Sequence, residues 1–171
     1  LEILNELRET APDAFRRGTT SFLRAGERLV VRRLDEVSDE DIRAGVLLEQ
    51  GSDSLVGRGV PKDASQAAAL FQKAAAAGNP EAAFWLGVLY FEGRGVGADR
   101  AQSLHWFQVG AKGGSPNAML RLGTIYARKG APEKAVHWWG ETIKRKHANN
   151  AARAAARKNL AEIRTRYPQL R

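Results

Sequence analysis

Residues 82–99 read AAFWLGVLYFEGRGVGAD, an apolar run that ends in three glycines placed around an arginine and a valine. The end of this stretch has an earlier copy, GRGVPKD, at residues 57–63. Glycines in this arrangement occur in loops that bind phosphate and in tight turns between helices. A phosphate loop needs a preceding strand and usually a lysine followed by a hydroxyl residue, and neither is found here. The two segments are therefore interpreted as interhelical turns with glycines at positive φ.

The two turns belong to a longer repeat. A shift of 36 residues takes Gly57 to Gly93 and superimposes the flanking residues as well. The matched pairs after the turns are Asp63 and Asp99, Phe71 and Phe107, Ala75 and Ala111, Gly78 and Gly114, and Pro80 and Pro116. The same shift carries Ala82, Leu86, Gly87 and Tyr90 onto Ala118, Leu122, Gly123 and Tyr126. Periods of roughly 20 to 50 residues are typical of solenoids.

Each period is expected to contain two helices. In the first helix the matched residues recur at i, i+4, i+5 and i+8, so they share one face that packs on a neighbouring helix. The glycine of that face lets two backbones approach closely. A second helix is expected over residues 99–111, between the glycine turn and the Gly-Gly-Ser-Pro break at residues 113–116. Each unit is therefore helix, glycine loop, helix and turn.

The pattern A-x-x-x-L-G-x-x-Y-x-x-G-x-G-V-x-x-D, followed by W-F-x-x-x-A and a glycine turn, resembles the Sel-one-like repeat of the tetratricopeptide class. Residues 82–114 carry nearly all of this pattern, and the resemblance extends over about residues 45–147. It implies an all-α, right-handed superhelical solenoid of antiparallel helix pairs, with about three repeats and a C-terminal capping helix. It also implies a scaffold that binds other proteins.

The outer units depart from the pattern. In the first unit the positions of leucine, glycine and tyrosine hold Gln50, Gly51 and Ser54. In the third unit Trp138 follows its counterpart Trp106 by only 32 residues, so the loop between its helices has lost four residues and its glycine pair. Trp106 and Trp138, and Trp139 at the position of Phe107, are expected in the core.

Residues 1–34 lie outside the repeat. Apolar residues near the start suit a short amphipathic helix, and residues 28–32, RLVVR, suit a strand. The segment resembles the back half of the LysM-like module of FimV-type envelope proteins, although the first strand and its G-D-T loop are absent before Leu1. The resemblance implies a bacterial envelope protein, in the periplasm, that contacts peptidoglycan once the module is completed upstream. The structural alternative is a helix and strand that merely cap the first repeat. The alternative to an envelope location is the cytoplasm.

Three segments are expected: residues 1–38 as a partial LysM-like or capping segment with a linker, 39–147 as repeats, and 148–171 as a basic capping helix and tail. Ser38 and the three acids after it resemble a capping box that starts a helix. The chain has no cysteine, which excludes disulfides and thiolate sites. No apolar run reaches the roughly 18 to 20 residues of a membrane span. Because the sequence begins at Leu1 rather than methionine, we expect a processed or excised fragment.

The net charge of +8 is concentrated at the C-terminus. Residues 1–143 carry 18 Lys and Arg against 18 Asp and Glu, whereas residues 144–171 carry 9 basic residues against Glu162 alone. If residues 146–166 form one helix, four of the basic residues lie on one line as a basic stripe, namely Lys146, Arg153, Arg157 and Arg164. A separate apolar stripe is expected to cap the solenoid, namely Ala152, Ala156, Leu160 and Ile163.

The basic stripe is interpreted either as a solvated face or as a surface for an acidic partner, an anionic lipid or nucleic acid. Nucleic acid is disfavoured because Tyr167 is the one aromatic residue near the stripe, and single-stranded binders need stacking platforms.

A partner-binding groove is predicted on the concave face of the first helices. Trp85 precedes Leu86, at a position where the family tends to have a small polar residue that faces inward. Helical spacing at i, i+3 and i+7 predicts that two sets of three residues share this face, namely Trp85, Val88 and Glu92, and Arg121, Thr124 and Arg128. Exposed tryptophan and arginine would be strong anchors for a peptide. The alternatives for Trp85 are burial against the N-terminal segment or a stray surface position.

No catalytic residues, cofactor or metal ligands are expected. Neither a Gly-x-Ser-x-Gly elbow nor a paired acid and base is present, and the three histidines lack the i, i+4 spacing of helical metal sites. The sequence therefore predicts a non-enzymatic adaptor that holds a protein or peptide in its concave groove. The resemblance to FimV-type envelope proteins implies a link to assembly of a pilus, secretion or polar complex. The alternative is a binder of nucleic acid or anionic surfaces through the basic helix.

Overall fold

A computed structural model of the chain describes residues 21–25, 28–32 and 38–170. The N-terminal part forms an antiparallel hairpin of β1 (Ser21–Ala25) and β2 (Arg28–Arg32). The strand predicted at residues 28–32 is therefore present. The amphipathic helix expected near Leu1 lies outside the described residues, as does most of the segment that resembles the LysM-like module.

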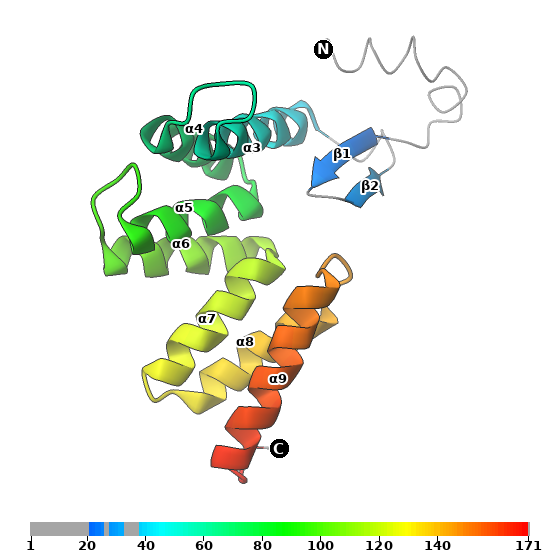
Figure 1. Ribbon diagram of the computed structural model, residues 1–171. Helices are drawn as coiled ribbons and strands as arrows, with labels where there is room; N and C mark the ends of the chain where they lie inside the picture. The colour runs from blue at the N-terminus through cyan, green and yellow to red at the C-terminus, as the bar shows by residue number, and fades with distance from the viewer. Residues whose placement is uncertain (1–20, 26–27, 33–37, 171) are drawn as a thin grey trace.

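Residues 38–170 form an all-α repeat structure, as the sequence predicts. Its helices are α3 (Asp39–Val56), α4 (Ala64–Ala76), α5 (Pro80–Glu92), α6 (Arg100–Gly113), α7 (Pro116–Arg128), α8 (Pro132–Lys144) and α9 (Asn150–Arg166). Figure 1 shows α3 with α4, α5 with α6 and α7 with α8 as antiparallel pairs stacked in chain order, with α9 at the end. No helix in the described ranges is long and apolar enough to cross a lipid bilayer.

The acids that end each glycine loop start the next helix. Asp63 Oδ1 accepts hydrogen bonds from two backbone amides of α4, and Asp99 Oδ1 does the same for α6, at distances of 2.8–3.0 Å. At the start of α3, Ser38 and Asp41 form the predicted capping box. Such caps satisfy amides that the helix itself leaves without partners. The repeated aspartate is thus explained by helix capping rather than by chemistry.

The glycine loops adopt the backbone conformation expected of them. Gly57 and Gly93 end their helices at φ of 82° and 69°, and Gly59 and Gly95 follow at 71° and 72°. A backbone hydrogen bond then closes each loop, and it recurs in all three repeats: Asp63 to Ser54 at 2.8 Å, Asp99 to Tyr90 at 2.9 Å, and Ala131 to Tyr126 at 2.9 Å. The third loop keeps this bond although it is four residues shorter.

Within each repeat a glycine of the first helix receives an aromatic ring from the second. The three pairs are Gly51 with Phe71, Gly87 with Phe107, and Gly123 with Trp139. A methyl group added at Gly87 would lie 2.7 Å from the ring of Phe107, so only glycine fits this approach. The first repeat keeps this contact, even though Gln50 and Ser54 replace the leucine and tyrosine of the pattern.

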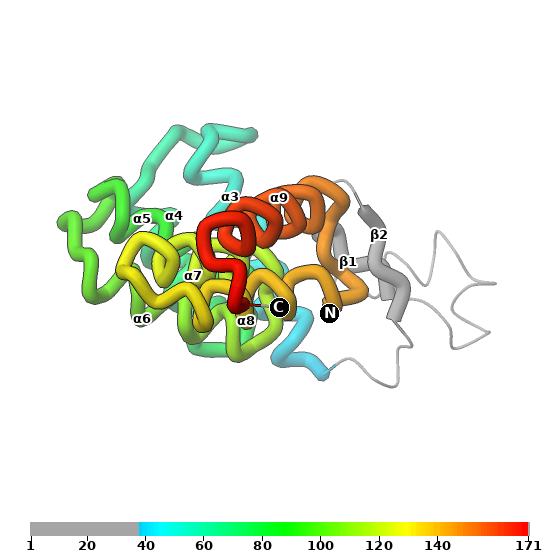
Figure 2. The backbone as a smooth tube through the Cα atoms, turned by 90° about the horizontal axis from the view of Figure 1, so that it is seen from below, coloured from blue at the N-terminus to red at the C-terminus, as the bar shows by residue number. Residues whose placement is uncertain are grey.

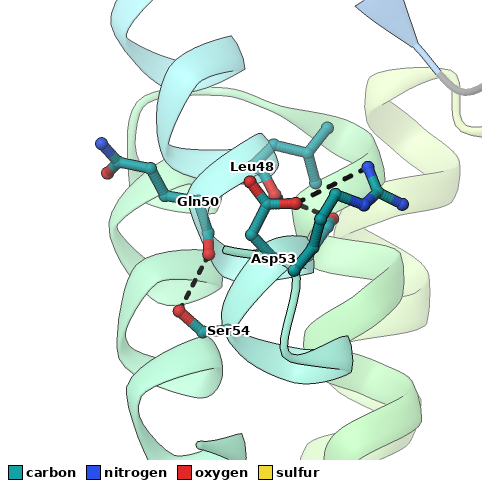
Figure 3. A network of polar contacts seen from close by, with 6 residues as sticks. Leu48, Gln50, Asp53 and Ser54 are labelled. Carbon is teal, nitrogen blue, oxygen red and sulfur yellow. Dashed lines mark hydrogen bonds and ion pairs between the residues drawn. The ribbon is translucent and has the colours of Figure 1, made fainter. Parts of the chain in front are cut away.

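The buried serine of the first repeat is satisfied within its own helix. Ser54 is 3% exposed, and its hydroxyl donates to the carbonyl of Gln50 at 2.9 Å (Figure 3). On the neighbouring side of the helix Asp53 lies 3.6 Å from the guanidinium of Arg58 (Figure 3). Replacement of tyrosine by serine therefore leaves no buried hydroxyl without a partner.

The core is a row of three clusters of buried side chains that follows the stack. Trp139 is 4% exposed in the last cluster, and Trp106 and Trp138 are half-buried against the clusters of the preceding helices. All four residues of the predicted apolar stripe on α9 are buried: Ala152, Ala156, Leu160 and Ile163. The last cluster joins α9 to α8, so α9 caps the C-terminal end of the solenoid.

Candidate functional site

The first helices of successive pairs line the inner side of the stack. In the described part of the chain α5 contacts α7 and α7 contacts α9, whereas α4, α6 and α8 make no contacts of similar extent with one another. Helices on the inside of a curved stack are closer together than those on the outside, so α5, α7 and α9 lie on the concave side. Figure 2 shows α9 lying along α7 and α8 at the C-terminal end.

A pocket of about 230 Å³ opens between these three helices. The central helix contributes most of its lining, namely Asn117, Leu120, Arg121 and Thr124. Phe84 of α5 and Ala155 and Asn159 of α9 complete it. We call this surface the inner groove. It combines an apolar wall with amide, hydroxyl and guanidinium groups.

A carboxylate bridge holds α7 against α5 at the end of the inner groove. Glu81, in the first turn of α5, accepts hydrogen bonds from the Ser115 hydroxyl and the Asn117 amide, each at 2.7 Å. Ser115 also caps α7 by accepting from the Ala118 amide at 3.2 Å. Because Glu81 occupies the same repeat position as Asn117, the bridge joins equivalent places in successive units. It fixes the Asn117 side chain at the pocket.

The guanidinium of Arg121 is the charged group of the pocket. Its side chain is exposed, and no carboxylate of the described residues lies within 4.0 Å of it. Thr124, one turn further along α7, is half-buried, and its hydroxyl donates to the Leu120 carbonyl at 3.1 Å. The predicted pair of Arg121 and Thr124 therefore comes together in one pocket.

Trp85 has a different environment from the exposed one expected. It is half-buried, with its ring stacked 6.3 Å from Phe71 and edge-on at 5.3 Å from Phe84. It fills the space between the first and second clusters of the core and does not line the pocket. The neighbouring Phe84 reaches the pocket instead.

The other predicted groove residues are also placed outside the pocket. Val88 is half-buried against the second cluster, and Glu92 is exposed and paired with Arg94 at 3.2 Å. Arg128 is exposed at the last turn of α7, on the same face as Arg121 because seven residues make nearly two helical turns.

The basic stripe expected on the last helix does not form as a single line. The helix begins at Asn150, capped by Asn149, so Lys146 lies in the turn before it. Arg153 folds back and donates to the carbonyls of Arg145 and Lys146 at 2.8 and 3.0 Å. Of the four predicted residues, Arg157 and Arg164 remain exposed on α9. The prediction was wrong for two reasons. It extended the helix through the turn before Asn150, and it assigned Arg153 to the solvent-exposed face although its guanidinium binds main-chain carbonyls.

Five pocket residues were not predicted from the sequence: Phe84, Asn117, Leu120, Ala155 and Asn159. The sequence did contain an indication that α9 is a further first helix. Its N-cap Asn149 follows Ser115, the N-cap of α7, at nearly the repeat spacing. The apolar stripe of this helix was interpreted as a terminal cap, so the helix was not identified as a fourth groove helix.

The Glu141 carboxyl and the two repeat histidines, His105 and His137, lie outside the pocket. The hydrogen bond from Lys144 lowers the pKa of the Glu141 carboxyl, which lies on α8 and not in the pocket. His105 and His137 each sit edge-on to the tryptophan that follows, at 5.3 and 5.1 Å. No group of three or more His, Cys, Asp or Glu within the described ranges is placed to hold a metal ion.

Antiparallel helix pairs stacked in chain order define the chain as a helical-repeat protein. Three consecutive segments, residues 43–79, 80–115 and 116–145, each match the family model described as Sel1 repeat. The chain belongs to the Sel1 repeat family. Sel1 repeat proteins generally mediate protein–protein interactions, and the family is one of non-catalytic interaction scaffolds.

Solved structures share this fold. A protective antigen present in uropathogenic Escherichia coli strains, which displays an SLR fold, is 27% identical with a TM-score of 0.57 over 70% of this chain. A Sel1 repeat protein from Oxalobacter formigenes is 23% identical with a TM-score of 0.57 over 72% of this chain. The chain spans 30% and 58% of these two proteins, respectively. A comparison with curated protein sequences gave no significant match.

Proposed function

We propose that this chain is an adaptor that holds a segment of another protein in the inner groove. The pocket between α5, α7 and α9 is the observation that carries this proposal. Its volume of about 230 Å³ is smaller than the roughly 300 to 1,000 Å³ of small-molecule sites, and it suits an anchoring side chain. Apolar walls beside a few fixed polar groups give a peptide both affinity and orientation.

The alternative, an anionic-surface binder, has less support. It requires a continuous line of positive charge on α9, but Lys146 lies outside the helix and Arg153 donates to main-chain carbonyls. Exposed basic residues remain on α9, namely Arg157, Lys158, Arg164 and Arg166, and such residues on a helix usually form a solvated face. The inner groove is therefore the better candidate for partner recognition.

The adaptor proposal is tested by filling the groove. Peptides are selected from a random library with the wild-type chain, and their affinities are then measured by fluorescence anisotropy. Ala155→Trp places a large side chain in the pocket, and we expect it to weaken binding at least tenfold because the anchor loses its space. Ala161→Trp, at an exposed position of the same helix, is the matched control and should leave affinity unchanged. Circular dichroism of both variants confirms the fold. Peptides that bind the two variants equally well would place the binding surface elsewhere.

We also propose a bacterial envelope location, with a role in assembling a pilus, secretion or polar complex. The support is the resemblance of residues 1–34 to a LysM-like module. Sedimentation with purified peptidoglycan sacculi tests it, using the chain, a form lacking residues 1–38, and a form extended upstream of Leu1 where the natural protein has such residues. We expect the extended form to sediment with the sacculi even at moderate salt, and the form lacking residues 1–38 to stay in solution. Release of every form by moderate salt would contradict wall binding.

A further inference from the structure

We propose that the inner groove selects an acidic segment of its partner, and that Arg121 and Arg128 bind two acidic side chains spaced three residues apart. This inference rests on the adaptor function and names the chemistry of its ligand.

The positive charge of the groove lies on the central helix. Arg121 lies at the pocket and Arg128 lies two turns further along the same face, and both are exposed. The sequence of α7 contains no acid. Within the described residues no carboxylate lies within 4.0 Å of either guanidinium. Within the described part of the chain, the two cations are therefore open to a ligand.

The acids on the flanking groove helices are already engaged. Both carboxylate oxygens of Glu81 accept hydrogen bonds, one from the Ser115 hydroxyl and one from the Asn117 amide, at 2.7 Å each. Glu92 pairs with Arg94 at 3.2 Å, and Glu162 lies 3.9 Å from Lys158. These are the acids of α5 and α9, so no carboxylate of the groove helices competes for the arginines of α7.

The pocket lining suits an aspartate or glutamate side chain. A guanidinium presents N–H donors in a planar fork that matches a carboxylate, and such charge-assisted bonds are stronger than neutral ones. The Asn159 amide adds a neutral donor from the opposite wall, and Phe84 and Leu120 can cover the methylene groups. The guanidinium would repel a basic side chain, and a neutral side chain would form no charge-assisted bond with it.

The distance between the arginines sets the spacing of the acids. Seven residues of helix rise about 10.5 Å at roughly 1.5 Å per residue. An extended peptide advances about 3.3–3.6 Å per residue, so three residues span nearly the same distance. An extended segment that lies alongside α7 therefore meets both arginines with acids at i and i+3. Because the two acids belong to one segment, at least one is an internal side chain rather than a chain terminus.

Peptide selection tests this directly. The random library is displayed with the carboxyl end of each peptide fused to the carrier, so that side chains are the source of carboxylates. We expect peptides that bind in the groove, as judged by Ala155→Trp, to be enriched in acid-x-x-acid sequences. A synthetic peptide of this kind should bind at least tenfold more tightly than its counterpart with Asn or Gln in place of both acids.

Variants of the two arginines provide a second test of the inference. Arg121→Gln is expected to lower the affinity for the acidic peptide at least tenfold and to leave the affinity for its Asn/Gln counterpart unchanged. Arg128→Gln, further from the pocket, should have a smaller effect in the same direction. Arg157→Gln removes an exposed arginine outside the pocket and is expected to stay within about twofold of wild type, since such charges are largely screened.

The outcomes separate this inference from the proposed function. If peptides lose binding on Ala155→Trp but lack acids, or do not respond to Arg121→Gln, the acidic ligand is wrong and the adaptor function stands. If the selected peptides are insensitive to Ala155→Trp, the inner groove is not the binding surface and both proposals fall. Equal losses for Arg121→Gln and Arg157→Gln would show general charge attraction and would also overturn the inference.

Discussion

Trp139→Ala is expected to lower the free energy of unfolding by about 3–5 kcal/mol, the usual range for truncating a buried aromatic ring. The ring is 4% exposed and lies directly against Gly123, and its Nε1 donates to the Leu120 carbonyl at 3.3 Å. Removal therefore opens a cavity between α7 and α8 and takes away a hydrogen bond between them. Urea unfolding followed by circular dichroism measures the loss.

The neighbouring tryptophan is the matched control for this prediction. Trp138 is half-buried, so Trp138→Ala should cost clearly less than Trp139→Ala. Gly123→Ala should itself destabilise by about 1–3 kcal/mol, because its methyl group would overlap the Trp139 ring. In the double variant the methyl group occupies space vacated by the ring, so the loss should be smaller than the sum of the two. Strictly additive losses would contradict the contact.

A further control shows that alanine at a helical glycine is not harmful in itself. Gly140, in the interior of α8, has no atom within 4 Å of an added methyl group. Gly140→Ala should therefore stabilise the protein by about 0.5–1 kcal/mol, because alanine loses less backbone entropy in a helix.

Gly95→Ala is expected to destabilise the protein by about 2–5 kcal/mol through two effects. At φ of 72° an alanine costs about 1–2 kcal/mol of backbone strain. Its methyl group would also overlap the Ala64 carbonyl oxygen at the start of α4, which adds about 1–3 kcal/mol of overpacking. Backbone cannot move aside as the end of a flexible side chain can. The midpoint of urea unfolding reports the sum.

The first loop supplies a control that separates the two effects. Gly59 occupies the same repeat position at φ of 71°, but nothing lies within 4 Å of an added methyl group. Gly59→Ala should therefore show the strain alone, about 1–2 kcal/mol. If Gly59→Ala and Gly95→Ala were equally destabilising, the contact between the second loop and the preceding repeat would contribute nothing.

The repeat shift predicted the helices because the residues that recur are those that packing requires. Gly87 and Gly123 recur because a ring from the second helix leaves no room for a side chain. Asp63 and Asp99 recur because each caps a helix. Contacts within a repeat are set by short stretches of chain, so the period records them directly.

The candidate site was predicted only in part because its contacts cross between repeats. Trp85 was expected in the groove from its repeat position and helical spacing, but its ring stacks on Phe71 of the preceding helix and is half-buried. Arg153 was assigned to the surface, but its long side chain reaches carbonyls eight residues earlier. Helical spacing identifies a face, whereas the neighbour across that face decides whether a side chain is free.

The third loop, four residues shorter than the second, closes with the same backbone hydrogen bond from Ala131 to Tyr126. The closing bond therefore tolerates a change in loop length. Over evolutionary time, insertions and deletions can accumulate in these loops and create new surfaces while the inner groove keeps its shape. A tag or fluorophore for binding studies is best inserted in the first loop, where nothing lies within 4 Å of a methyl group added at Gly59.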